Sequence, residues 1–597
     1  MNDRKLRDLV AEVKAGRLSR RDFVNRMIAV GLTAPIAGMV LSQSGVAMAE
    51  TAIPYKPPKA GGGGPLKLLL WQAPTLLNPH FAVGVKDQEA CRLFYEPLAG
   101  WDQDGNLVPI LAAEIPSKEN DGLAEDGLSV VWKVKKGVKW HDGAPFTADD
   151  VVFTSEYAKN PETAAVSIGS YKDLKAVEKV DDHTVRLTFA KPTPFWADAF
   201  VGVFGPIIPK HLFANYVGGK SREAPANLKP VGTGPYLFVD FKPGDVVLGK
   251  RNLDYHQENR PYFDTVEMKG GGDAVSAARA VLQTGEYDYA WNMQVEDDIL
   301  QKLEAGGKGK VSFVPTGNIE FIGLNVTDPN VEVDGERSSV KTRHPLFSDP
   351  AVREALNLLI DRASIVKFIY GRGSLATGNF LNNPERFRSK NVKFEFNIEK
   401  ANQILEAAGW KKGTDGIRAK DGKQLKFAYQ TSINSPRQKN QAIVKQACQK
   451  AGIDVELKSV VASVFFSSDT ANPDTYAHFY CDAQMYQYAL QQPDPQLFMN
   501  QFVSSEVATR ENKWQGRNVH RWQNKEYDDL FLQAQGELDV VKRAAMFIKL
   551  NEIVVGDHYI LPEVNRPRVT ALKSDLVAHP SGWDSDLWQI ANWYREA

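Results

Sequence analysis

The sequence predicts a mixed α/β protein with two or three domains, and two observations carry this prediction. The chain has 597 residues, which is more than one hydrophobic core usually organises. Helical and short strand patterns alternate along it without a fixed repeat of about 20–50 residues, which argues against a solenoid or propeller. Beyond the N-terminal segment no stretch approaches ~18 uninterrupted apolar residues. We therefore expect the rest of the chain to fold in water.

The N-terminal segment has the layout of a targeting signal. A positively charged front precedes a mildly apolar run over 27–46 and a small-residue ending. The order SRRDF over 19–23 resembles the twin-arginine signal, which an export machinery reads as an address. We expect 1–49 to be a twin-arginine signal peptide, cleaved after Ala49 to release the protein into the periplasm. The alternative is a short amphipathic helix followed by an uncleaved anchor.

Charge and composition narrow the choice of partners for the remaining chain. Residues 1–49 hold 8 basic and 4 acidic side chains, so their removal takes the formal net charge from −1 to −5. A mildly acidic surface argues against nucleic acid or an anionic membrane as a general partner. Residues 50–65 are rich in Pro and Gly and are typical of a flexible lead-in. Their four consecutive glycines, 61–64, lack the Gly-Lys-Ser/Thr ending of a phosphate loop.

The cysteines give a weak signal. An exported chain with Cys91, Cys448 and Cys481 has an odd number of thiols. Three buried free thiols are the favoured interpretation, and a Cys448–Cys481 disulfide is the alternative. In either case we expect the hydrophobic core to hold the fold.

Individual elements follow from periodicity and turn chemistry. An apolar run over 66–71 predicts a buried strand, and alternation over 130–138 predicts a half-buried one. A turn at 141–143 precedes Thr147, which begins a helix with Asp150 as its capping-box partner. Further helices are expected over 351–370, 397–408, 437–451 and 540–555, and further strands over 184–189, 236–241, 319–325 and 455–461.

Catalytic and metal motifs find little support in the sequence. The 10 histidines include no His-x-x-x-His pair, and there is neither a His-Glu-x-x-His nor a Cys-x-x-Cys motif. His141 beside Asp142 could form an acid–base pair, but the turn explains both residues more simply. We expect no enzyme activity, no metal and no cofactor. Many aromatic residues stand beside Gln and Asn, which suits a cleft that stacks on a ligand and hydrogen-bonds it with neutral groups.

Four ordered segments carry a family resemblance. They are GVKWHDGAPFTADDVVFT (137–154), PVGTGPYLF (230–238), DPAVREALNLLIDRASIV (349–366) and YDDLFLQAQGELDVVKRAAMFIKLNEIVVGDHYILP (527–562). Together they resemble the extracytoplasmic solute-binding proteins of peptide, oligopeptide and nickel ABC importers (family 5 solute-binding proteins), from about Leu66 to the C-terminus. This agrees with an exported, multi-lobed chain that lacks a catalytic constellation.

The resemblance implies a two-lobed periplasmic-binding-protein fold with mixed sheets, a hinge between the lobes and an inserted subdomain. The implied boundaries are 66–97, 213–324 and 561–597 for lobe I, 98–212 for the inserted subdomain, and 325–560 for lobe II. Such a receptor would serve an ABC permease with its ATPase. We expect it to be monomeric.

The resemblance also implies site residues. Peptide-binding members hold the ligand's amino group with an Asp shortly before an Asp-Pro pair. Here Asp494 begins that pair, but Gln491 occupies the matching position. Where dipeptide binders carry a carboxylate-binding Arg, this sequence has Thr431, with Arg437 nearby. The remaining candidate ligand-binding residues are Gln72, Trp291, Asn379 and Tyr488.

Without both charged anchors, a free zwitterionic dipeptide would be poorly held, because a buried unpaired charge costs several kcal/mol. Three hypotheses follow. The first is a receptor for peptides, including longer or capped ones held through the backbone. The second is the same fold binding a non-peptide solute, such as an oligosaccharide or an opine-like conjugate. The third and weakest is an exported hydrolase.

The export prediction can be tested by changing Arg20 and Arg21 together to Lys. The precursor should remain in the cytoplasm, because a receptor for this signal distinguishes a planar guanidinium from an ammonium. Cell fractionation measures the outcome, with Arg4→Lys as the matched change outside the motif. Normal periplasmic accumulation of the double variant would instead indicate the general secretory route.

Overall fold

The computed structural model describes residues 54–467, 469 and 471–596, together with Leu9, 11–13, Leu18, 22–23 and 26–27. The expected cleavage site and most of the expected leader therefore lie outside the described residues. Within the described part of the chain, no helix combines the length and the apolar character needed to cross a bilayer.

The first lobe is built on a seven-stranded sheet with the order β11-β23-β10-β1-β9-β8-β7. β1 lies inside it and runs parallel to both of its neighbours, β9 and β10. The side chains of β1 alternate in burial, and Leu66, Leu68 and Leu70 are fully buried, as expected for a strand at this apolar run. The strands are β1 (Pro65–Leu70), β7 (Tyr236–Lys242), β8 (Val246–Arg251), β9 (Thr265–Gly270), β10 (Tyr289–Ala290), β11 (Gly309–Val314) and β23 (Arg568–Lys573).

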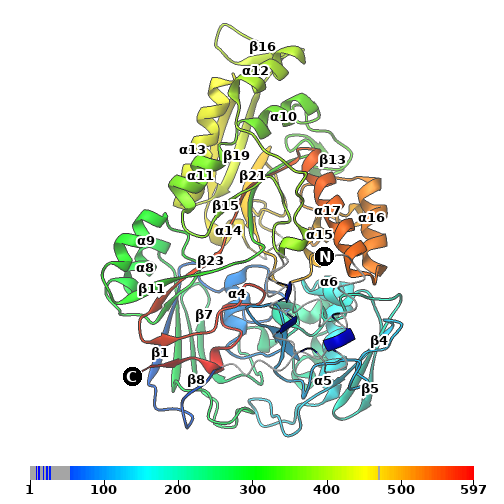
Figure 1. The fold of residues 1–597 in the computed structure, drawn as a ribbon, viewed down its shortest axis with the longest axis vertical. Helices are drawn as coiled ribbons and strands as arrows, with labels where there is room; N and C mark the ends of the chain where they lie inside the picture. The colour runs from blue at the N-terminus through cyan, green and yellow to red at the C-terminus, as the bar shows by residue number, and fades with distance from the viewer. Residues whose placement is uncertain are drawn as a thin grey trace.

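The second lobe is built on a six-stranded sheet with the order β15-β22-β12-β21-β19-β20. It is mixed, since β12 is antiparallel to both of its neighbours while β19 is parallel to both of its own. Figure 1 shows this lobe above the first one, with the helices α10 to α13 around its upper strands. The strands are β12 (Ile319–Leu324), β15 (Leu375–Ala376), β19 (Lys426–Ser432), β20 (Asp454–Val460), β21 (Ala483–Tyr488) and β22 (Ile560–Asn565).

Two crossings connect the sheets, at 315–318 between β11 and β12 and at 566–567 between β22 and β23. They are hydrogen-bonded to each other. The Thr316 hydroxyl donates to the carbonyl of Arg566 at 2.7 Å, and the Arg566 amide donates to the carbonyl of Asn318 at 3.0 Å. The family resemblance placed the lobe boundaries at 324/325 and 560/561, whereas sheet membership assigns both β12 and β22 to the second lobe.

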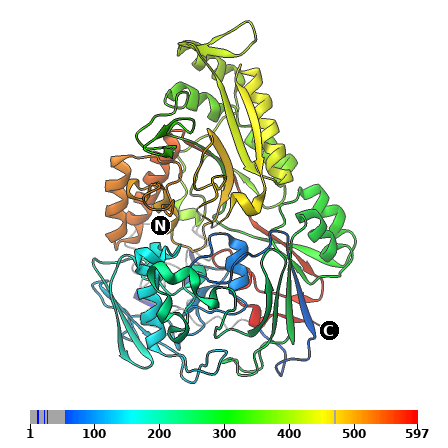
Figure 2. The ribbon, with the colours of Figure 1, turned by 180° about the vertical axis from the view of Figure 1, so that it is seen from behind.

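A subdomain beside the first sheet contains a three-stranded sheet, β4-β6-β5, next to helix α5. Figure 2 shows it from behind as the cyan part of the first lobe. Helix α5 (Ala148–Lys159) starts as predicted: Thr147 and Asp150 form a capping box. The strands are β4 (Ser129–Lys133), β5 (Leu174–Asp181) and β6 (Thr184–Phe189). The half-buried strand expected over 130–138 therefore ends earlier than predicted.

His141, in the turn before α5, has a structural role. Its ring bonds the Gly232 amide at 3.1 Å and the Gly234 carbonyl at 3.0 Å, and burial lowers its pKa to about 4. The ring is therefore neutral at neutral pH. A Cβ on Gly232 would lie 1.8 Å from the Phe94 carbonyl oxygen, so glycine is required here by close backbone approach.

The helix expected over 351–370 is interrupted. Helix α10 ends at Leu358, and Asp361 then caps a new helix, α11, by accepting from the Ser364 amide at 3.0 Å. Buried Arg362 donates to the carbonyl of Pro562 at 2.7 Å, which fixes the break against the second sheet. A periodic apolar pattern in the sequence does not reveal that one helix ends and a second one begins within it.

The other predicted helices match α12, α13 and α17 to within two residues at each end. The three cysteines are free and buried, which confirms the favoured interpretation over a disulfide. The helices are α4 (Val85–Cys91), α6 (Ile168–Tyr171), α7 (Lys210–Phe213), α8 (Ala274–Leu282), α9 (Asp297–Glu304), α10 (Pro350–Leu358), α11 (Arg362–Ile365), α12 (Ile398–Ala407), α13 (Ser435–Lys450), α14 (Ala462–Phe465), α15 (Gln496–Met499), α16 (Lys525–Gly536) and α17 (Val540–Gly556). Short strands complete the description: β2 (Ala99–Trp101), β3 (Leu107–Pro109), β13 (Glu332–Val333), β14 (Glu336–Arg337), β16 (Lys411–Lys412), β17 (Arg418–Lys420), β18 (Lys423–Gln424), β24 (Leu576–Val577) and β25 (Tyr594–Arg595).

Candidate functional site

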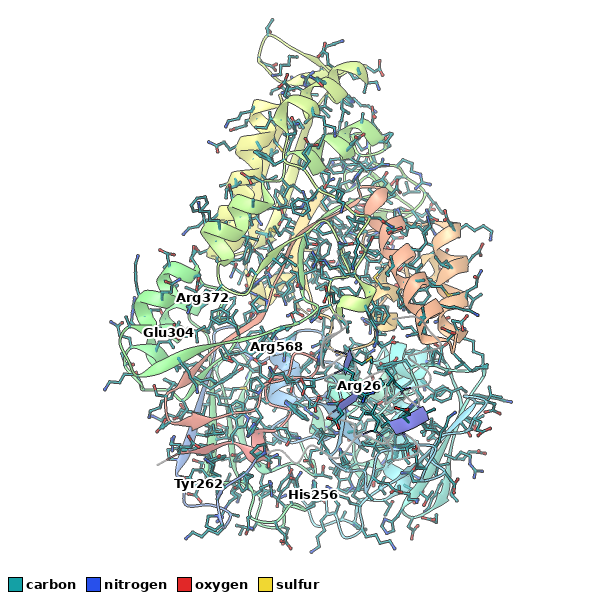
Figure 3. All side chains as sticks on the ribbon, in the orientation of Figure 1. Arg26, His256, Tyr262, Glu304, Arg372 and Arg568 are labelled. Carbon is teal, nitrogen blue, oxygen red and sulfur yellow. The ribbon has the colours of Figure 1, made fainter. Side chains whose placement is uncertain are left out.

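A cavity of about 490 Å³ lies between the two lobes, against both crossings. Asn318 on the first crossing and Pro567 on the second line it. Figure 3 labels Arg568, another lining residue, where the upper and lower lobes meet. The volume falls within the usual range for sites that enclose small molecules.

A neutral hydrogen bond joins the lobes inside this cavity. Gln491, which follows β21, donates from Nε2 to Oε1 of Gln88 on α4 at 2.7 Å. The Gln88 side chain is oriented by its own bond from Nε2 to the Ala82 carbonyl at 3.1 Å. The pair can donate to and accept from a ligand without adding net charge.

Aromatic faces form part of the wall. Trp291 lines the cavity from the first lobe, and Tyr488, which packs on Phe498 with ring centroids 5.5 Å apart, lines it from the second. Trp514 packs on His478 with ring centroids 4.0 Å apart, and burial lowers the pKa of His478 to about 4. These rings are therefore uncharged surfaces for stacking.

Most lining cations are paired with carboxylates of the protein. Arg437 makes a two-pronged contact with Glu320 at 3.1 Å on each side, and Arg568 lies 2.9 Å from Asp586. Burial alone would raise the pKa of Glu320, but Arg437 and Arg566 hold it below its usual range. Two further lining cations, Lys86 and Lys172, pair with Asp87 and Glu506 respectively.

Arg517 differs from these cations. It lines the cavity, and its two side-chain hydrogen bonds are long, at 3.4 Å to the Tyr488 hydroxyl and 3.5 Å to the Val166 carbonyl. No carboxylate in the described part of the chain lies within 4.0 Å of its guanidinium. Burial alone would lower the pKa of Arg517, while its interactions with Tyr488 and Glu506 raise it above the usual range.

The structure brings five of the eight candidate residues to one cavity: Gln72, Trp291, Arg437, Tyr488 and Gln491. The other three are engaged inside the protein. Asn379 bonds Asn551 at 2.7 Å, the Thr431 hydroxyl donates to the Met485 carbonyl at 2.9 Å, and Asp494 pairs with Arg543 at 3.0 Å. Thr431 in particular belongs to the hydrogen bonding of the second sheet, where it lies on β19 beside β21.

Sequence reasoning missed Gln88 and Arg517. Gln88 lies on a short helix of the first lobe whose sequence gives no sign of what it faces. Arg517 lies in the segment between α15 and α16, where neither helical nor strand periodicity provides an orientation. Among the described residues, no group of three or more His, Cys, Asp and Glu side chains is arranged to hold a metal ion.

The fold and this cavity agree with what sequence comparison finds. A family described as bacterial extracellular solute-binding proteins, family 5 (middle region), matches residues 106–509. This chain belongs to that family. A family 5 solute-binding protein serves an ABC importer outside the cytoplasm and is not an enzyme, so the hydrolase hypothesis is excluded.

This chain is similar to the oligopeptide-binding protein AppA of Bacillus subtilis, with 30% identity over 544 residues. The match covers 89% of this chain and 92% of AppA. It is 28% identical to the glutathione-binding protein GsiB of Pectobacterium atrosepticum over 342 residues, 57% of this chain and 60% of that protein. The structure of AppA in complex with a nonapeptide matches with a TM-score of 0.76 and 27% identity, covering 91% of this chain and all of that one. The structure of NikZ of Campylobacter jejuni in complex with Ni(L-His) matches with a TM-score of 0.74 over 89% of this chain and 99% of NikZ. At 23% identity this match supports only a shared fold.

The placement of Asp494 generates a prediction. Asp494→Asn should lower the free energy of unfolding by about 3–5 kcal/mol, because it leaves the buried Arg543 guanidinium without its counter-charge. Urea unfolding measures this loss. Asp529→Asn, which removes an exposed carboxylate paired with Lys525, is the matched control and should cost less than about 1 kcal/mol. A stable Asp494→Asn protein with weakened solute binding would instead indicate a direct role in the site.

Proposed function

We propose that this solute-binding protein captures a peptide or peptide-like solute in the interlobe cavity and delivers it to an ABC permease. One observation carries the proposal: residues of both lobes line the same cavity and meet there through the Gln491–Gln88 hydrogen bond. A solute in this position would contact both lobes at once and so favour their closure. The similarity to AppA, named an oligopeptide-binding protein, supports a peptide-like ligand.

Export is part of the same proposal. The arginine pair and the apolar run of 1–49 support delivery to the periplasm by the twin-arginine route, with cleavage after Ala49. The mature protein would act as a monomer that meets its permease at the membrane.

A non-peptide solute is the second candidate, and Gln491 favours it. A neutral amide stands where the family resemblance places an amine-holding carboxylate. With Gln72 and the Trp291 and Tyr488 rings, it would suit hydroxyl groups and the faces of sugar rings or an opine-like conjugate.

The function can be tested on protein purified from its own periplasm. Native mass spectrometry should detect a small bound solute, and restoring that solute to stripped protein should reduce the radius of gyration and raise the melting temperature. A peptide bond in the released solute distinguishes the first candidate from the second. The proposal would be contradicted if no solute co-purified and no member of a tripeptide panel bound.

Gln491→Asp should weaken binding of the released solute by about 1–3 kcal/mol, because a carboxylate at this partly buried position cannot donate to Gln88 and would face a neutral group of the solute. Calorimetry measures this loss, and the exposed Gln438→Asp on α13 controls for adding one negative charge. The same substitution should improve binding of tripeptides with free amines. If the unmutated protein already binds such tripeptides tightly, and Gln491→Ala abolishes this binding, the solute is an ordinary peptide and the neutral-solute candidate fails.

A further inference from the structure

The guanidinium of Arg517 lies in a preformed slot on the cavity wall. A Cβ on Gly169 would lie 3.3 Å from Arg517 Nε and 3.4 Å from its Nη2, so the glycine leaves room for the guanidinium. The guanidinium carbon lies 5.6 Å from the centre of the Phe204 ring. Because Val166, Gly169 and Phe204 belong to the subdomain beside the first sheet, Arg517 reaches across the cleft from the second lobe.

Among the described residues, no carboxylate lies within 4.0 Å of the Arg517 guanidinium to balance its positive charge. Glu506 is the lining carboxylate that acts on Arg517, and Glu506 is already paired with Lys172. Asp198 lies outside the cavity lining and also acts on Arg517. Burial raises the pKa of Asp198 to about 6, so this carboxyl is still largely ionised at neutral pH, but it makes no ion pair within 4.0 Å with Arg517 among the described residues. The remaining lining carboxylate, Asp469, belongs to an exposed loop and accepts from the Ala471 amide at 2.9 Å.

The present partners of Arg517 are poor substitutes for an anion. Its bonds to a hydroxyl and a carbonyl, at 3.4 and 3.5 Å, are longer than the usual ~2.7–3.2 Å range for nitrogen donors. A guanidinium presents a rigid fork of donors that matches the two oxygens of a carboxylate. Arg517 is partly buried, faces the solute cavity, and has no carboxylate within 4.0 Å in the described part of the chain, so it is suited to receive one from the solute.

We infer that Arg517 binds a carboxylate of the solute, and that the natural solute is an acid without a free ammonium group in the cavity. The second part follows from the Gln491–Gln88 pair, which offers neutral hydrogen bonds and no carboxylate to a cation. The solute class is therefore an N-acylated or otherwise amine-blocked peptide-like acid. This inference rests on the proposed function and narrows its ligand class.

The test uses one tripeptide, Ala-Tyr-Ala, in four forms: free or acetylated at the amino end, and free acid or amide at the carboxyl end. Calorimetry on the full mature protein should rank the acetylated acid first. Amidation of its carboxyl group should weaken binding at least tenfold, and a free amine should weaken it as well. This comparison needs no variant and so does not depend on one folding.

Variants then assign the preference to one side chain. Arg517→Gln should remove the difference between acid and amide, Arg517→Lys should retain part of it, and Arg510→Gln should leave it intact. Arg510 is an exposed arginine on the same segment outside the cavity lining, so it controls for the loss of one positive charge. Thermal unfolding verifies that each variant is folded.

The outcomes separate the inference from the function on which it rests. Equal binding of acid and amide forms, or an Arg517→Gln protein that still prefers the acid, overturns the inference and leaves peptide capture standing. Preference for the free amine over the acetylated form overturns the second part of the inference. Failure of all four forms to bind contradicts peptide capture itself, and with it the inference.

Discussion

One buried carboxylate, Glu320, connects the two crossings between the lobes, 315–318 and 566–567, to the wall of the cavity. It is the second residue of β12, directly after the first crossing, and it is fully buried. Arg437 at the start of α13 contacts it from one side, and Arg566 on the second crossing contacts it at 2.6 Å from the other. Because removing one partner of a buried ion pair costs about 3–5 kcal/mol, both crossings and the first turn of α13 are held in one arrangement.

This constraint decides which cations remain for a solute. Arg437 reaches the cavity, but Glu320 already neutralises it, so sequence proximity to Thr431 does not make it a carboxylate anchor. Arg568 is likewise committed to Asp586, which also accepts from the Tyr289 hydroxyl at 2.6 Å. The cations next to the hinge thus belong to the scaffold. Arg517 reaches the cavity from a segment remote from both crossings in the sequence.

The sequence could predict what depends on local pattern. The Thr147 capping box, the buried strand at 66–71 and the mixed α/β architecture follow from side-chain chemistry over a few residues. Pairing across the sheets was beyond its reach, since Asp494 appears in the sequence as a motif residue and its partner Arg543 lies on α17. The sequence could identify Gln491 as a site residue because Gln491 lies only three residues before the Asp494-Pro495 pair. Arg517 had no such marker, because its role depends on Val166 and Phe204, which are distant in the chain.

The contacts that hold the lobes together differ between the cavity and the outer side of the cleft. Outside the cavity, Arg372 of the second lobe contacts Asp297 and Glu304 of α9 at 2.6 and 3.1 Å, and Figure 3 labels Arg372 and Glu304. Glu296, just before α9, accepts from the Ser435 hydroxyl at 2.7 Å. Arg372 is partly exposed, so its ion pairs contribute at most about 1 kcal/mol each. Inside the cavity the Gln491–Gln88 bond contributes a net ~0.5–1.5 kcal/mol. A solute with its own hydrogen-bond donors and acceptors could replace that neutral bond at little cost while the outer ion pairs stay intact. The contacts that a solute makes with both walls would therefore add to the outer contacts that already join the lobes, and a solute shifts the lobes toward a closed arrangement only by the difference between its affinities for the two arrangements.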